Sequence, residues 1–172
     1  MKITTKKIAL MGLFVGLITL ANIFTIQIIP PYFVLSFVLT ISFLAGLYLG
    51  PIEGFIVCIL GDLTGCIIHP LGPFNFLVNL ASGIMGLVFG FNKNKTNIFK
   101  ILLTFLIVTL ICTSGLNTLG LWLMYAVGKK TFFVYLLARL PWQLLNSAVN
   151  CTLSISVYEI LKRRLYDNCI HT

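Results

Sequence analysis

Four polar side chains recur on one predicted helix near the end of the chain: Arg139, Gln143, Asn146 and Asn150. They lie four, seven and eleven residues from the arginine, so an α-helix presents them along one face. A guanidinium can donate two parallel hydrogen bonds to a carboxylate, and amides both donate and accept. This polar stripe can therefore bind a polar heterocyclic ligand, or it can hold neighbouring helices together. We favour a pocket, because interhelical contacts seldom need four such groups in one row.

Other residues with suitable chemistry surround the polar stripe in the sequence. Asn117 and Thr118 lie on the preceding apolar segment, and Asn79 lies four residues after Asn75 on an earlier one. Amide groups on facing helices would extend the same pocket. Aromatic side chains suit the faces of a flat ring, and the candidate walls are Phe74, Trp122 and Trp142.

Asp62 and Arg139 are opposite charges within apolar segments. Counted from the predicted ends of their helices, they lie roughly 10 Å and 12 Å deep. An isolated charge in a membrane costs about 2.5 to 3.5 kcal/mol on insertion scales, so each is expected to find a partner or water. We predict an ion pair between them, with the alternative that Arg139 is free to bind an anionic or carbonyl-bearing ligand.

The composition identifies the setting of these groups as a membrane. The chain has 172 residues, of which 59% are hydrophobic and 9% are charged, and its mean hydropathy is +1.04. A soluble domain has about 25% charged residues, and continuous apolar runs exclude a membrane β-barrel. The sequence therefore predicts an all-α, multi-pass protein of the cell membrane. A single domain over 1–172 would have six spans, at approximately 8–26, 34–49, 52–68, 74–91, 98–126 and 132–161.

Positive charge predicts the orientation of these spans. Three clusters of basic residues would share one side of the membrane: Lys2, Lys6 and Lys7; Lys93, Lys95 and Lys100; and Lys162, Arg163 and Arg164. Lys129 and Lys130 would lie on the other side. The positive-inside rule then places both termini in the cytoplasm. The basic residues are not interleaved with aromatic ones, so we expect no nucleic acid as partner.

Several classes of site are disfavoured by the absence of their motifs. The five cysteines contain no C-x-x-C pair, so we expect no disulfide framework and no metal site. Neither H-E-x-x-H nor a Walker A motif occurs. We expect neither an enzyme nor a cofactor bound by this chain.

Small residues on the first span suggest a contact surface. Ala9, Gly12 and Gly16 are three or four residues apart and share one helix face. Small faces let membrane helices approach closely. The face would either pack within this chain or dock a partner subunit.

Three stretches of the sequence, at residues 43–76, 116–125 and 138–150, resemble one known family. They read "FLAGLYLGPIEGFIVCILGDLTGCIIHPLGPFNF", "LNTLGLWLMY" and "ARLPWQLLNSAVN". The family is that of the substrate-binding S components of energy-coupling factor (ECF) vitamin transporters, and the likeness is greatest to its folate-type members.

The resemblance implies a six-helix subunit that captures a vitamin from outside. It further implies docking, through Ala9, Gly12 and Gly16, onto a membrane coupling subunit driven by two ATP-binding subunits, which use the ATP. Pocket residues that the resemblance carries over are Asn117, Thr118, Arg139 and Gln143.

Two departures from the folate-type pattern leave the ligand open. Asn22 stands in a region where those members usually have an arginine, and "FNFLVN" stands where they usually have a sequence close to "GFT". Folate is the expected ligand, and the alternatives are another water-soluble vitamin or a heterocyclic precursor, such as pantothenate or a queuosine precursor. From a different class, the alternative is a membrane scaffold that transports nothing.

Overall fold

The computed structural model describes residues 5–29, 33–70, 72–93, 97–128 and 131–170. Its elements are α1 (Thr5–Ile23), β1 (Ile26–Ile29), β2 (Phe33–Leu35), α2 (Val38–Leu49), α3 (Pro51–Ile68), α4 (Phe76–Gly90), α5 (Ile98–Val108), the π-helix η1 (Thr109–Asn117), α6 (Thr118–Tyr125) and α7 (Phe132–Ile170). The predicted six-helix membrane fold is confirmed, because α5, η1 and α6 form one continuous segment and the described residues then contain six helical segments. Lys2, Lys95, Lys129 and Lys130 lie outside the described residues.

Within the described residues, three helical stretches are long and apolar enough to cross a membrane, and two further apolar helices are shorter. The long ones are Thr5–Ile23, Pro51–Ile68 and Ile98–Tyr125, and the shorter ones are Val38–Leu49 and Phe76–Gly90. Their outward surfaces carry many exposed leucine, isoleucine and phenylalanine side chains. An apolar exterior of this extent is what a lipid environment accepts.

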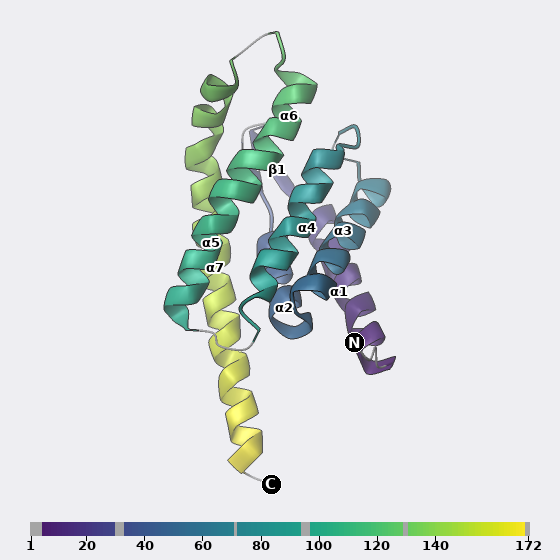
Figure 1. The fold of residues 1–172 in the computed structure, drawn as a ribbon, viewed down its shortest axis with the longest axis vertical. Coiled ribbons are helices and arrows are strands. Elements are labelled where there is room, and N and C mark those ends of the chain that lie inside the picture. The colour runs from purple at the N-terminus through teal and green to yellow at the C-terminus, as the bar shows by residue number, and fades with distance from the viewer. Residues whose placement is uncertain (1–4, 30–32, 71, 94–96, 129–130, 171–172) are drawn as a thin grey trace.

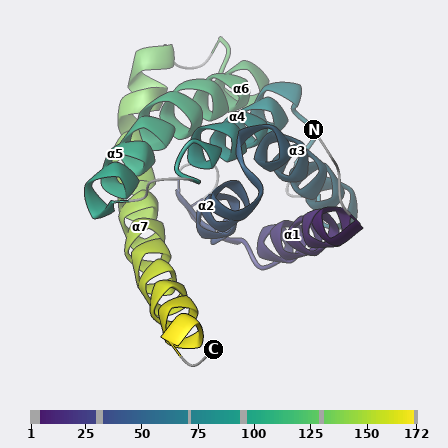
Figure 2. The ribbon, with the colours of Figure 1, turned by 60° about the horizontal axis from the view of Figure 1, so that its bottom comes forward.

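The helices form two groups that meet around α2. α1, α3 and α4 lie on one side, and the α5–η1–α6 segment with α7 lies on the other (Figure 1). α2 contacts α1, α3, α4 and α7, so it occupies the centre of the arrangement (Figure 2). The core on the α5 side contains Phe43, Phe89 and Phe105, whose ring centroids are 4.9 to 5.6 Å apart.

Glycines bring α3 and α4 into direct backbone contact. A Cβ atom added at Gly86 would lie 2.3 Å from the backbone oxygen of Gly54, which is closer than a non-bonded carbon and oxygen can approach. Gly50, with φ of 106°, makes the turn between α2 and α3, and Pro51 begins α3. Left-handed backbone favours glycine, and proline suits the first helical position, where no N–H donor is required.

A β-hairpin lies between the first two helices, where the sequence predicted only a break between the spans at 8–26 and 34–49. β1 and β2 pair antiparallel, with Ile26 opposite Leu35 and Gln27 opposite Val34. α2 begins only at Val38, whose N–H donates to the Ser36 hydroxyl at 3.2 Å. α7 extends beyond the predicted end at residue 161 and reaches Ile170.

Candidate ligand-binding site

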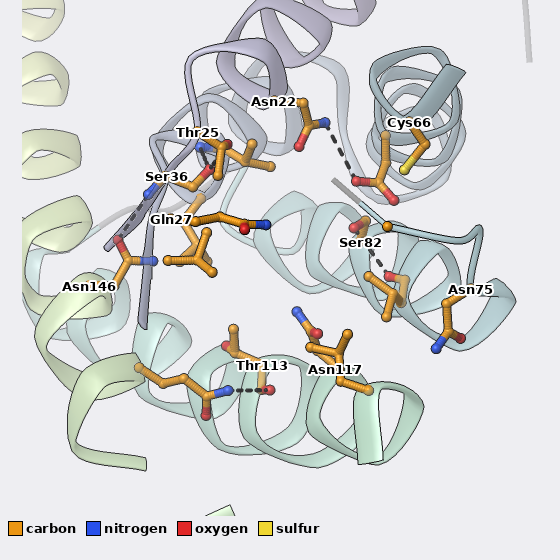
Figure 3. Close-up of a pocket in the computed structure, with 18 of the residues that line it drawn as sticks. Asn22, Thr25, Gln27, Ser36, Cys66, Asn75, Ser82, Thr113, Asn117 and Asn146 are labelled. Atoms are coloured by element: carbon orange, nitrogen blue, oxygen red, sulfur yellow. Dashed lines mark hydrogen bonds between the residues drawn. The ribbon is translucent and has the colours of Figure 1, made fainter. Parts of the chain in front are cut away.

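A cavity of about 490 Å³ lies at the end of the bundle that carries the β-hairpin. It is lined by the C-terminal ends of α1 and α3, the β-hairpin, the start of α2, the loop before α4, α4 itself, the η1–α6 segment and the first half of α7. In Figure 3, Thr113 and Asn117 approach the centre from one side, and Asn22 and Ser82 approach from the opposite side. The volume lies within the range of roughly 300 to 1,000 Å³ that is typical of small-molecule sites.

The polar stripe on α7 supplies one wall of this cavity. Arg139, Gln143 and Asn146 line it, and Trp142 lies among them. Arg139 is only 5% exposed, and its guanidinium carbon lies 5.7 Å from the centroid of the Tyr135 ring. Stacking on an aromatic ring stabilises a cation and restricts its orientation.

Thr118 lies behind this wall and holds two of its members. The Thr118 hydroxyl accepts hydrogen bonds from Nη1 of Arg139 at 3.3 Å and from Nε2 of Gln143 at 3.0 Å. It donates to the backbone carbonyl of Thr113 at 3.2 Å. Oε1 of Gln143 accepts from the Ser114 hydroxyl at 2.8 Å. Since Thr118 is completely buried and does not line the cavity, its role is to position Arg139 and Gln143.

The π-helix η1 presents groups to the cavity from the facing segment. π-helical turns are rare and occur frequently at functional sites. Gln143 Nε2 donates to the backbone carbonyl of Thr113 at 3.1 Å. The buried Oδ1 of Asn117 and the buried Nε of Arg139 have no hydrogen-bond partner among the described residues. Both residues line the cavity, and these two unpaired atoms are themselves buried within its wall.

Asp62 lies on the α3 wall and is bound by amides. Its Oδ2 accepts from Nδ2 of Asn79 at 3.1 Å, and its Oδ1 accepts from Nδ2 of Asn22 at 3.5 Å. The predicted ion pair with Arg139 is not formed, because among the described residues the ion pairs do not include these two groups. The physical reason is that the two helices are not neighbours: α3 and α7 make no contact within the described part of the chain.

Asn150, the last member of the polar stripe, does not line the cavity among the residues described. Its Oδ1 accepts from the N–H and hydroxyl of Thr40, and its Nδ2 donates to the backbone carbonyls of Ser36 and Asn146. It therefore joins α7 to the start of α2. Three members of the stripe thus line the cavity, and Asn150 makes interhelical contacts instead.

Some predicted pocket residues occupy other positions. Asn79 supports Asp62 rather than lining the cavity, and Trp122 packs edge-on against Phe132 with centroids 5.8 Å apart. Phe74 is 52% exposed and does not line the cavity. Because aromatic rings are also common at membrane interfaces, sequence alone does not show which of them turn inward.

Several lining residues were not among the predicted site residues. They include Thr25, Gln27, Ser36, Cys66, Ser82 and Tyr125. All but Ser82 are near the ends of helices or in the hairpin. The available signal was the concentration of polar residues at the ends of apolar runs on one side of the membrane. Among the described residues, no group of three or more His, Cys, Asp or Glu side chains is placed to hold a metal ion.

The small residues of α1 lie away from the cavity, on the surface. Ala9, Gly12 and Gly16 are exposed, and a Cβ atom added at Gly12 or Gly16 would meet no atom within 4 Å. Packing within this chain, one of the two interpretations of this face, is therefore not observed among the described residues.

Comparison with known proteins identifies the family. A crystal structure of FolT bound with folic acid has a TM-score of 0.79 and 22% identity, over 90% of this chain and 93% of that one. The structure of the S component of a bacterial ECF transporter has a TM-score of 0.70 and 22% identity, over 93% of this chain and 97% of that one. At such identity the likeness shows a shared fold. No curated protein matches the sequence at a significant level. The model of a family described as "ECF transporter, substrate-specific component" matches residues 6–158, so the chain belongs to this family of membrane transport proteins.

Proposed function

We propose that this chain captures folate or a closely related vitamin and passes it to an ATP-driven coupling module. The observation that carries the proposal is the cavity wall of Arg139 and Gln143, held in place by Thr118, in a chain of the S-component family. The folic acid in the similarly folded FolT structure supports folate as the first ligand to test. Pantothenate and a queuosine precursor are the alternatives.

The available groups of the cavity suit a polar, partly flat ligand. The Arg139 guanidinium can donate to a carboxylate or carbonyl oxygen, and the Asn117 side-chain amide can both donate and accept. Trp142 and Tyr125 line the same space and offer aromatic surfaces to a ring. An anionic ligand would also give Arg139 the oppositely charged partner that it lacks among the described residues, which favours the bound state.

The charge distribution supports an orientation in the cell membrane with the cavity open to the outside. Lys7 contacts Glu53, and Lys93 donates to the backbone carbonyl of Leu49 at 2.8 Å. Lys7 is in the first turn of α1 and Lys93 follows α4, and the start of α1 and the end of α4 lie away from the hairpin end of the bundle (Figure 1). By the positive-inside rule the end with these lysines is cytoplasmic, and both termini lie on the same side.

We further propose that the exposed face of Ala9, Gly12 and Gly16 docks onto a membrane coupling subunit, which two ATP-binding subunits drive. The open space beside both glycines supports this role, since small faces allow a partner helix to approach closely. The vitamin would be released inward when ATP hydrolysis rearranges the partners.

The test is ligand binding by the purified chain in detergent or nanodiscs without ATP. Isothermal titration with folate, pantothenate and a queuosine precursor should show tight binding of one of them, with folate expected. Arg139→Gln should weaken binding on the order of tenfold or more, because a charge-assisted hydrogen bond is lost. Lys100→Gln, which removes an exposed positive charge on α5, should leave binding unchanged.

Two results would contradict the proposal. A folded Arg139→Gln protein that binds as the parent does would remove the role of the arginine. Binding of none of the vitamins, together with a mass spectrum of the purified protein that shows no retained small molecule, would favour the scaffold function instead.

A further inference from the structure

Asp62 is a buried carboxylate in the cavity wall that has only neutral partners. It is 7% exposed and lines the cavity. Its hydrogen bonds come from the side-chain amides of Asn22 and Asn79, at 3.5 and 3.1 Å. A carboxylate has about four acceptor positions, so these two bonds leave capacity for further donors.

The amides also fix the direction in which this carboxylate is presented. Nδ2 of Asn79 donates both to Asp62 and to the backbone carbonyl of Ile59 at 3.2 Å. Asn22 is on α1, the other helix beside Asp62, and its side chain packs against Gly65 of α3. Two helices thus brace Asp62 from its sides. Orientation by such supporting hydrogen bonds is typical of side chains that bind ligands.

The cavity therefore carries a carboxylate on α3 and a guanidinium on α7 that do not neutralise one another. Arg139 is 5% exposed, and its contacts are the Thr118 hydroxyl and the Tyr135 ring. Neither charge has an oppositely charged partner among the described residues. Buried charges are costly unless they are paired, so a ligand with donors at one end and an acceptor or anion at the other would stabilise both.

We propose that Asp62 forms a second subsite, which accepts a pair of adjacent N–H donors from a flat heterocycle of the aminopyrimidine class. The proposal rests on the proposed function and names the chemistry of its ligand. Two parallel N–H···O bonds match the two oxygens of one carboxylate. Trp142 and Tyr125 line the same cavity and suit the faces of the ring. Arg139 then binds the acceptor-bearing part of the same molecule.

This subsite separates the candidate ligands by chemistry. Folate and a deazapurine precursor both have an aminopyrimidine edge with adjacent N–H donors. Pantothenate has hydroxyl, amide and carboxylate groups but no such edge, so Asp62 would disfavour it. A site built to bond a ligand N–H rejects an analogue that lacks it more strongly than an apolar site would.

The experiment compares pterin with lumazine, in which a carbonyl oxygen replaces the amino group of pterin. The purified full chain should bind pterin on the order of tenfold to a hundredfold more tightly, because lumazine places an acceptor against the carboxylate. Asp62→Asn, in which one oxygen becomes a donor, should remove most of this preference. Glu53→Gln, the same kind of change at a buried acid paired with Lys7, should preserve it.

The outcomes distinguish this subsite from the general function. Tight folate binding without a preference between pterin and lumazine would overturn the subsite and leave the function standing. Binding of pantothenate, with neither pteridine bound, would do the same. The preference of the parent protein is itself decisive, so the test does not depend on the folding of any variant. A chain that binds no vitamin and no pteridine would overturn both proposals.

Discussion

Replacing Thr118 by valine tests whether the cavity is organised by residues that no ligand touches. The two side chains have nearly the same shape, and Thr118 is completely buried outside the cavity lining. The substitution removes the acceptor for Arg139 and Gln143 and the donor to the Thr113 carbonyl. Any effect on binding must therefore pass through the orientation of Arg139 and Gln143, or of Thr113, which also lines the cavity.

The magnitude depends mainly on Arg139, because Gln143 keeps its hydrogen bonds to Ser114 and to the Thr113 carbonyl. Ordering a long side chain on binding costs about 0.5 to 1.5 kcal/mol. For Arg139 the loss is therefore about 0.5 to 1.5 kcal/mol, or roughly a twofold to tenfold rise in Kd. Hydrogen bonds within membranes average about 0.6 kcal/mol, so the loss of the Thr118 bonds should lower stability by only ~2 kcal/mol.

Binding is measured by titration of the fluorescence of Trp142, which lines the cavity, and folding by thermal unfolding. Thr152→Val is the matched control, because the Thr152 hydroxyl is exposed and bonds only to Ala148 and Val149 of its own helix. Thr118→Ser, which keeps the hydroxyl, should restore most of the affinity. A Thr118→Val protein with a lowered Tm and an unchanged Kd would refute the reasoning, since the threonine would then be structural only.

Three further substitutions probe the fold, with thermal unfolding as the measurement. Gly86→Ala should lower stability by about 1 to 3 kcal/mol or prevent folding, because the new methyl group meets the backbone of α3; Gly12→Ala, with open space around it, should not. Lys7→Met should lower the Tm more than the double substitution Lys7→Met/Glu53→Gln, since only the single one leaves the buried Glu53 charge unpaired; equal losses would contradict this. Asn150→Leu should cost about 2 to 3 kcal/mol, at ~0.6 kcal/mol for each hydrogen bond lost, and a stable variant would mean that these bonds contribute little.

Helix positions were predictable because membrane helices are continuous apolar runs that end at recognisable residues. Gly50 and Pro51 end one helix and begin the next, and both are visible in the sequence. The hairpin was not predictable, since its strands Ile26–Ile29 and Phe33–Leu35 are too short to show alternation. The π-helix η1 (Thr109–Asn117) was not predicted either, since the apolar run through it is continuous with that of α5 and α6.

The sequence predicted that the polar stripe forms one surface, but its members have two roles. They share an angle around the helix axis and lie at different positions along it. Asn150 lies eleven residues after Arg139, which is nearly the same angle but roughly 16 Å further along the axis. At that depth the cavity has ended, and α2 provides the Thr40 backbone and hydroxyl as partners. Periodicity gives the angle of a residue, whereas the end of a cavity depends on neighbours that periodicity does not describe.

Position across the membrane plane, rather than depth, explains why Asp62 and Arg139 do not pair. Counting residues gives the depth of each charge in the membrane, and equal depth is necessary for a pair but not sufficient. Lateral neighbours decide the rest, and α1 and α4 reach Asp62 with Asn22 and Asn79, while Thr118 and Tyr135 engage Arg139. Because neutral groups brace each charge without cancelling it, the cavity between α3 and α7 keeps an acidic side and a basic side. A binding subunit that must select one polar molecule from water gains more from this separation than from a completed ion pair, whose groups would already be satisfied.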